Sequence, residues 1–415
     1  MKKFDAYKSY LFIETASSLL YGLAFTAMSL YEIRVAGLSP LQLVLVGTTL
    51  ELSVLLCEVP TGVVADVYSR RLSILIGLCL IGLGFLLEGL VPLFAIILLA
   101  QVVWGLGYTF TSGATQAWLS DEIGEERANR AFLRANKFSL GGSLAGMLFA
   151  ILVGSRQINL PIRTSGGLFI LLAGLLFLGM PENGFHPAPL EQRNSFQQML
   201  RTFHLGLRTV RQRPRLMTIL GVGLFYGLYS EGFDRLWVKH LLGRFSLPVL
   251  FGSNAIAFFG LLRAASVLLS IVATALVEKR LDTSQPHRIG RLMFGITIGI
   301  TASILLFAWS PWLGLVLGVY LLISALRNLV GPLTNAWVNQ RLDSDVRATV
   351  LSMTGQVDAI GQIAGGPLIG LVASLFSVPA AMTVSGLLLT PALALIGVTN
   401  RREPPAEENR ATILR

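Results

Sequence analysis

Twelve apolar runs dominate the sequence, and each is long enough to cross a bilayer as a helix. Two of them, Leu72–Leu87 and Phe294–Phe307, are almost continuously apolar, whereas a membrane β-barrel needs segments of about ten residues that alternate apolar and polar side chains. The chain is 53% hydrophobic and 13% charged, and its mean hydropathy is +0.67. This composition excludes a water-soluble globular fold. We therefore predict an all-α membrane protein.

The runs fall into two groups of six, separated by a basic segment. We expect spans at residues 8–34, 40–66, 71–89, 92–118, 129–154, 162–180, 215–239, 248–277, 288–308, 311–337, 347–374 and 378–399. The predicted organisation has four parts: an N-terminal six-helix bundle (1–180), a cytoplasmic linker with an amphipathic helix (181–214), a C-terminal six-helix bundle (215–400) and a cytoplasmic tail (401–415).

A weak internal repeat relates the two halves. A shift of 219 residues aligns Ala117-Trp118 with Ala336-Trp337, and also aligns two glycine pairs, Gly142/Gly146 with Gly361/Gly365; a shift of 205 aligns Tyr21-Gly22-Leu23 with Tyr226-Gly227-Leu228. The repeat predicts two pseudo-symmetric bundles, the architecture of many secondary transporters. Glycines four apart let membrane helices pack closely, so we expect close contacts at these two pairs and at Gly295/Gly299 and Gly314/Gly318.

The net charge of +10 follows the predicted topology. With the N-terminus inside, 23 of the 33 lysines and arginines fall on the cytoplasmic side and 5 on the other. This asymmetry places both termini in the cytoplasm and explains the charge without a nucleic-acid partner. Short loops and the absence of an Asn-x-Ser/Thr sequon favour a bacterial plasma (inner) membrane.

The sequence offers no set of residues for catalysis or metal binding. Its only cysteines, Cys57 and Cys79, lie in apolar runs, and its four histidines lie in loops or at helix ends. We therefore expect no metal and no cofactor, and a membrane-embedded enzyme is the least supported class.

The loop between the second and third predicted spans carries a recognisable motif. It reads Gly62-Val-Val-Ala-Asp66-Val-Tyr-Ser-Arg70-Arg71 and resembles the G-x-x-x-D-R-x-G-R-[RK] loop of the major facilitator superfamily. The resemblance covers about residues 8 to 400 and implies transport by alternating access. It also implies a gating role for Gly62, Asp66, Arg70 and Arg71, with Asp66 meeting the start of the eleventh span near residues 346–348.

Three further stretches resemble a bacterial drug or tetracycline-type efflux branch of that superfamily. They begin at Glu58, Ala117 and Arg347 and read EVPTG, AWLSDE and RATVLS. Two positions depart from the pattern of proton-coupled exporters: Gln101 stands where an arginine is usual, and Met147 stands where the antiporter motif has proline.

Ionisable residues deep in the spans are candidates for the transport site. Each costs about 2.5 to 3.5 kcal/mol at the bilayer centre, so it requires a partner or a hydrated cavity. Those near the midplane are Glu51, Arg263, Arg327 and Asp358, and those nearer the outer face are Glu231, Asp234 and Arg235. They form either a buried structural network, with the carboxylates of the second half neutralising its arginines, or a polar cavity that binds substrate and exchanges protons.

Asp358 is the first candidate for proton coupling, because Gln362 lies one turn away on the same face and no basic partner is local. Glu51 is the second. Glu231 and Arg235 are four residues apart, so we expect a local ion pair.

Two functions follow from these features. The first is proton-coupled export of small amphipathic compounds or drugs by a secondary transporter. The alternative is uptake or exchange of a polar or anionic metabolite, coordinated by Arg263 and Arg327. In both, the expected partners are a small-molecule substrate, protons and the lipid bilayer, and the protein acts as a monomer.

Overall fold

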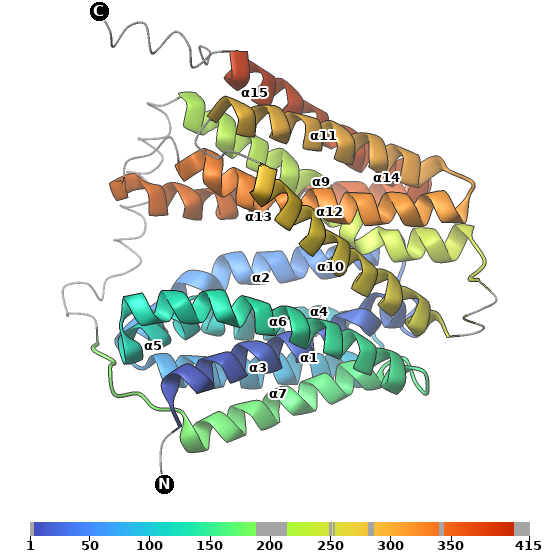
Figure 1. The fold of residues 1–415 in the computed structure, drawn as a ribbon. Coiled ribbons are helices and arrows are strands. Elements are labelled where there is room, and N and C mark those ends of the chain that lie inside the picture. The colour runs from blue at the N-terminus through green and yellow to red at the C-terminus, as the bar shows by residue number, and fades with distance from the viewer. Residues whose placement is uncertain are drawn as a thin grey trace, which may run out of the picture. The chain divides into compact units, whose positions relative to one another are not determined.

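The computed structural model describes residues 4–187, 214–248, 251, 254–280, 286–339 and 344–401, and these residues contain helices and loops without a strand. Figure 1 shows the helices. Their bounds are α1 (Ala6–Arg34), α2 (Pro40–Val67), α3 (Arg70–Leu90), α4 (Phe94–Thr111), α5 (Ala114–Ile123), α6 (Glu125–Gly154), α7 (Leu160–Gly179), α9 (Pro214–Arg244), α10 (Ala255–Arg280), α11 (Pro286–Trp309), α12 (Leu313–Asn339), α13 (Ser344–Leu375), α14 (Val378–Leu388) and α15 (Thr390–Arg401).

These helices provide twelve segments that are long and apolar enough to span a membrane. The predicted all-α fold class is therefore confirmed. Two spans differ from the prediction because each is made of two helices. The fourth is broken at Ser112–Gly113, where Gly113 has a φ of +71°, a conformation that glycine adopts without steric cost. The twelfth comprises α14 and α15, which meet at Leu389.

The contacts divide the chain into two units. The first unit comprises residues 1–199 and 246–264, and the second comprises residues 200–245 and 265–415, so α10 is divided between them. Most of the predicted linker (181–214) and nearly all of the predicted tail (401–415) lie outside the described residues. The predicted domain boundaries remain a prediction.

Helix packing in the first unit depends on glycines. α1 packs along α6, and α3 packs against α4 and α7 (Figure 1). A Cβ atom added at Gly22 would overlap the backbone of Ser143, and one added at Gly142 or Gly146 would overlap the carbonyl oxygen of Thr15 or Leu19, respectively. Only a residue without a side chain allows α1 and α6 to approach this closely.

The second unit repeats this packing. α9 packs along α13, and Gly227, Gly361 and Gly365 bring the two backbones together as Gly22, Gly142 and Gly146 do for α1 and α6. These are the positions that the sequence repeat aligns. The repeat is therefore structural, since aligned glycines perform the same packing in both units.

Close packing was expected at two further glycine pairs, and the structure contradicts this for three of the four positions. No described atom lies within 4 Å of a Cβ added at Gly295, Gly314 or Gly318; at Gly299 the added atom would touch Leu326. Spacing alone does not identify a packed glycine, because a glycine pair can equally lie on an outward face.

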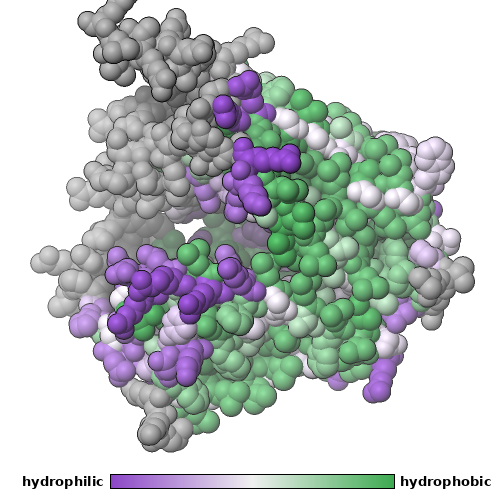
Figure 2. All heavy atoms as spheres, viewed as in Figure 1, coloured by the Kyte–Doolittle hydropathy of each residue, from purple (hydrophilic) through white to green (hydrophobic). Residues whose placement is uncertain are grey.

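The outer surface of the helices is apolar, as lipid requires. Figure 2 shows hydrophobic residues over most of the described surface in view, with hydrophilic residues at its margins. The exposed side chains include Leu152 (68%), Phe177 (65%) and Leu375 (68%). Helices of this kind satisfy their backbone polar groups internally, and this allows them to cross a bilayer.

Candidate functional site

The predicted gating motif lies at the junction of α2 and α3. Asp66 is in the last turn of α2, where a carboxylate opposes the helix dipole, and its side chain is 59% exposed. Arg70 lies 3.7 Å from the carboxylate of Asp66 and 2.8 Å from that of Asp121 in α5. The prediction did not assign Asp121 a role, although it is the closer partner. No described atom would meet a Cβ at Gly62.

Arg71 connects α3 to the end of α7. Its guanidinium donates to the carbonyl oxygen of Phe177, and its backbone N–H donates to Glu182 at 2.9 Å. Glu182 also accepts from the Ser69 hydroxyl at 2.7 Å, so its carboxylate caps the N-terminus of α3. The Trp118 indole donates to the carbonyl oxygen of Pro181. The first residues of the predicted linker are thus held against the first unit.

A cavity of about 240 Å³ in the second unit brings together three of the seven predicted charged residues: Asp234, Arg327 and Asp358. It is lined by Tyr226, Tyr229, Ser230, Asp234, Arg327, Val330, Gly331, Asp358 and Gln362, from α9, α12 and α13. Arg327 binds Asp234 through both carboxylate oxygens, at 2.5 and 2.6 Å. The guanidinium also lies over the rings of Tyr229 and Phe233, 5.6 and 5.7 Å from their centroids.

Asp358 lies in the same cavity with a neutral partner. Its carboxylate accepts a hydrogen bond of 2.8 Å from the Gln362 amide, one turn along α13, so the two side chains share a face as predicted. Glu231 and Arg235 form the expected ion pair at 2.9 Å. Neither residue of that pair lines the cavity.

Two further predicted site residues, Arg263 and Glu51, also lie outside this cavity. Arg263 is in the part of α10 that belongs to the first unit, and its guanidinium donates to the carbonyl oxygen of Phe25. Of the two arginines that carboxylates of the second half were predicted to neutralise, Arg327 is paired with Asp234; for Arg263 this remains a prediction. Glu51 is half-buried in α2, where it and Glu58 interact electrostatically with Tyr108 of α4.

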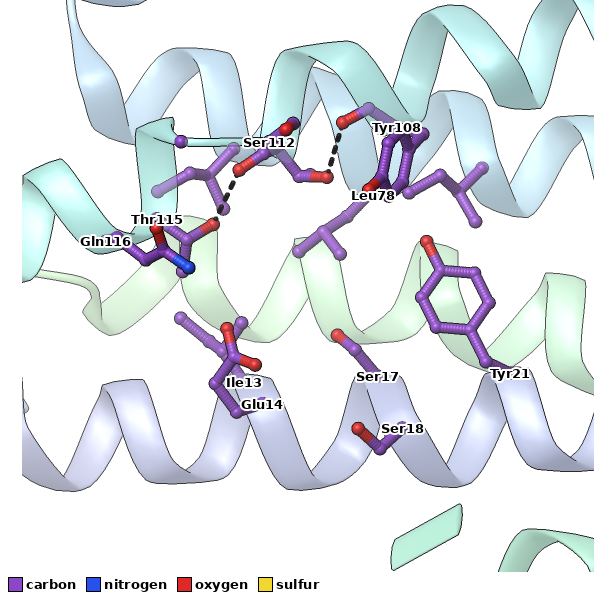
Figure 3. Close-up of a pocket in the computed structure, with 14 residues that line it drawn as sticks. Ile13, Glu14, Ser17, Ser18, Tyr21, Leu78, Tyr108, Ser112, Thr115 and Gln116 are labelled. Atoms are coloured by element: carbon purple, nitrogen blue, oxygen red, sulfur yellow. Dashed lines mark hydrogen bonds between the residues drawn. The ribbon is translucent and has the colours of Figure 1, made fainter. Parts of the chain in front are cut away.

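A second cavity, of about 300 Å³, lies within the first unit (Figure 3). Its lining comprises Ile13, Glu14, Ser17, Ser18 and Tyr21 of α1, Ile74, Leu78 and Ile81 of α3, Tyr108 and Thr111 of α4, Ser112 and Gly113 of the break, and Thr115 and Gln116 of α5. The Glu14 side chain leaves α1 on the side of Thr115 and Gln116. The break after α4 thus places the polar start of α5 at the cavity.

The two cavities use equivalent positions of the repeat. A shift of 205 relates Tyr21 to Tyr226, and a shift of 219 relates Tyr108 to Arg327. The same shift relates Thr111 and Ser112 to Val330 and Gly331. The first and fourth spans of each half therefore line a cavity, but the charged groups differ: the first cavity holds one carboxylate, and the second holds two carboxylates and a guanidinium.

Gln101 joins a buried polar network in the first unit. Its amide nitrogen donates to the carboxylate of Glu88 at 2.9 Å, and its amide oxygen accepts from the Trp104 indole at 2.8 Å. Glu88 and Gln101 are fully buried. At the position where the resemblance leads us to expect an arginine, a neutral amide therefore holds a buried carboxylate.

The family model described as Major Facilitator Superfamily matches residues 10–365. The chain belongs to the major facilitator superfamily. A curated relative, the uncharacterized MFS-type transporter YxaM of Bacillus subtilis (strain 168), is 23% identical over 354 residues, which are 84% of this chain and 85% of the relative. This superfamily member is accordingly a multi-pass membrane transporter of small molecules and not an enzyme.

Solved transporters share the fold of this superfamily member. The nucleoside transporter NupG has a TM-score of 0.74 at 13% identity, covering 97% of this chain and 100% of its own. A bacterial homologue of the human lysosomal transporter Spinster, inward-facing and unoccupied, has a TM-score of 0.74 at 16% identity, covering 97% and 98%. At this identity the likeness concerns the fold, so the efflux branch remains a prediction.

Three carboxylates of the candidate sites were not predicted to act there. Glu14 is a carboxylate inside the first apolar run, and its position there is the signal that could have identified it. Asp121 lies in the AWLSDE stretch, next to the fourth span. Glu182 follows the sixth span by a few residues, and no sequence pattern connects it to the start of α3.

Proposed function

We propose that the protein exports small amphipathic compounds, drugs included, in exchange for protons by alternating access. The observation that carries this proposal is the setting of Asp358, which faces a cavity in the second unit and is held by a neutral amide rather than by a bidentate arginine. A carboxylate with a neutral partner can gain and lose a proton without breaking an ion pair.

The proton gradient supplies sufficient energy for such a mechanism. One proton moving across 100 mV releases about 2.3 kcal/mol, which corresponds to a roughly 50-fold substrate gradient. Arg327 interacts electrostatically with Asp358 and is already bound to Asp234. Deprotonation of Asp358 would strengthen its attraction to Arg327 at the expense of Asp234, which links protonation to the geometry of α12 and α13.

The alternative is an uptake or exchange carrier for a polar or anionic metabolite. It requires an arginine at the cavity whose charge is not already neutralised by a carboxylate of the protein. Both terminal nitrogens of the Arg327 guanidinium donate to Asp234. Arg263 lies in the first unit, where it donates to a carbonyl oxygen. When Asp358 is deprotonated, the two carboxylates and one guanidinium of the second cavity sum to a net negative charge, which disfavours anions.

We further propose that the protein is a monomer of the plasma (inner) membrane with both termini in the cytoplasm. The 23-to-5 distribution of basic residues supports this orientation. Cysteines engineered near residues 195 and 244 test it, because a membrane-impermeant reagent added to intact cells should label the second position and not the first.

Direction and coupling are tested in vesicles. Everted vesicles energised with a pH gradient should accumulate substrate, and right-side-out vesicles should not; the reverse result would establish the uptake alternative. Asp358→Asn should abolish accumulation while exchange at equal concentrations continues. Glu278→Gln, an exposed carboxylate of α10, is the control and should accumulate normally. Full pH-dependent accumulation by Asp358→Asn would exclude Asp358 from coupling.

A further inference from the structure

The cavity of the first unit holds a carboxylate that the transport proposal does not use. Glu14 is half-buried, and within the described part of the chain its carboxylate makes no hydrogen bond or ion pair. A carboxylate inside a span is costly to insert. Because no cation of the described chain pairs with Glu14, a positively charged ligand would supply the missing counter-charge.

The rest of the cavity suits the apolar body of such a ligand. On one side it is lined by Ile74, Leu78 and Ile81 of α3. The rings of Tyr21 and Tyr108 lie on the same cavity (Figure 3), and aromatic faces attract cations, quaternary ammonium groups in particular. Its volume of about 300 Å³ is that of a small ligand site.

One of these rings is held rigidly in place. Tyr21 stacks on Phe25 with ring centroids 5.4 Å apart, and it also contacts Phe85 and Phe169 at 6.1 and 5.1 Å. Tyr21 therefore presents a fixed aromatic surface about two turns along α1 from Glu14. A rigid ring and a nearby carboxylate bind a cation without first having to be ordered.

We propose that this cavity is a binding site for organic cations, in which Glu14 neutralises the charge and Tyr21 and Tyr108 contact the apolar body. The assignment rests on the proposed function, since it names the class of compound that the transporter recognises. The site is specific to the first unit, because the position that a shift of 205 relates to Glu14 is Ile219.

Two ligands of the same shape test the role of charge. (4-Hydroxyphenyl)trimethylammonium carries one positive charge, and 4-tert-butylphenol replaces its nitrogen by carbon. Equilibrium binding of each is measured on the purified full-length protein in detergent at pH 7, where both phenol groups are largely protonated. Glu14→Gln should weaken binding of the cation about tenfold or more, because it removes a charge–charge interaction from a partly desolvated cavity. It should change binding of the phenol less than twofold.

Two further variants separate the charge of Glu14 from its structural role. Glu14→Asp keeps the carboxylate and should retain most of the affinity for the cation. Glu126→Gln removes a carboxylate that is 88% exposed on α6 and should affect neither ligand. Retained phenol binding by Glu14→Gln shows that this variant is folded.

Equal binding of the cation by the wild type and Glu14→Gln would overturn the inference. So would a wild type that binds the phenol and not the cation, or that binds neither. These measurements need no transport, so they remain valid if vesicles show no export. Absence of export by vesicles whose protein binds the cation would refute the proposed function and leave the site intact.

Discussion

The guanidinium of Arg327 has partners on two sides. Asp234 binds both ends of its fork, and the rings of Tyr229 and Phe233 lie beneath it. Such a bidentate pair in a low-dielectric setting is worth more than a surface ion pair. Removal of one partner leaves the other charge without its nearest counter-charge.

We predict that Arg327→Gln and Asp234→Asn each lower the melting temperature of the purified protein, and that the double variant loses less than their sum. The expected coupling energy is about 1 to 2 kcal/mol, below that of a fully buried pair because Asp234 is 46% exposed. The exposed pair Arg130–Glu126, at 3.0 Å, is the matched control and should show coupling close to zero. Equal coupling in the two cycles would contradict this account.

At the residue scale, the sequence predicts contacts within one helix better than contacts between helices. The pairs Glu231–Arg235 and Asp358–Gln362 follow from spacing of one turn, and both are present. The hydrogen bond from Arg263 to the Phe25 carbonyl oxygen was not predicted, because every residue carries such an acceptor. A contact with a backbone acceptor therefore cannot be predicted from residue identities.

At the scale of elements, α6 offers two neighbouring glycines in opposite environments. A Cβ added at Gly142 would overlap the carbonyl oxygen of Thr15 in α1, whereas no described atom lies within 4 Å of one at Gly141. We predict that Gly142→Ala destabilises the protein by about 1 to 3 kcal/mol, because α1 and α6 must move apart. Gly141→Ala should leave stability unchanged or slightly raised, since alanine favours a helix.

Thermal melting of the two purified variants compares them directly. Equal melting temperatures would mean that the α1–α6 contact tolerates a methyl group, and the packing role of this glycine row would be rejected.

The existence of the spans was predictable and their breaks were not. Apolar length identifies a span, but α4 ends at Thr111 because of a local conformation at Gly113. In the sequence, the only sign of this break is a glycine, and the chain has 42 glycines. The break matters for function, because it sets Thr115 and Gln116 at the cavity of the first unit.

At the scale of the whole molecule, the internal repeat explains why two cavities exist. The same packing of the first and fifth spans recurs in the second unit, and the same faces of the first and fourth spans line each cavity. The two halves share the packing of their first and fifth spans, whereas the charged residues of their cavities differ. The sequence therefore predicts the fold of both halves from one pattern, but it does not predict which charged groups line each cavity.

The last prediction concerns the change between conformations. Asp66 is exposed in the last turn of α2, 3.7 Å from Arg70, and makes no contact with either cavity. The expected partner, the α13 N-terminus near residues 346–348, would stabilise its carboxylate by about 0.3 to 1 kcal/mol. Asp66→Asn should therefore slow transport in proteoliposomes while equilibrium binding of substrate in detergent is unchanged. Asp121→Asn removes the nearer partner of Arg70 and retains Asp66, so it should slow transport less. Equal slowing would assign the effect to Arg70, and loss of substrate binding by folded Asp66→Asn would refute gating.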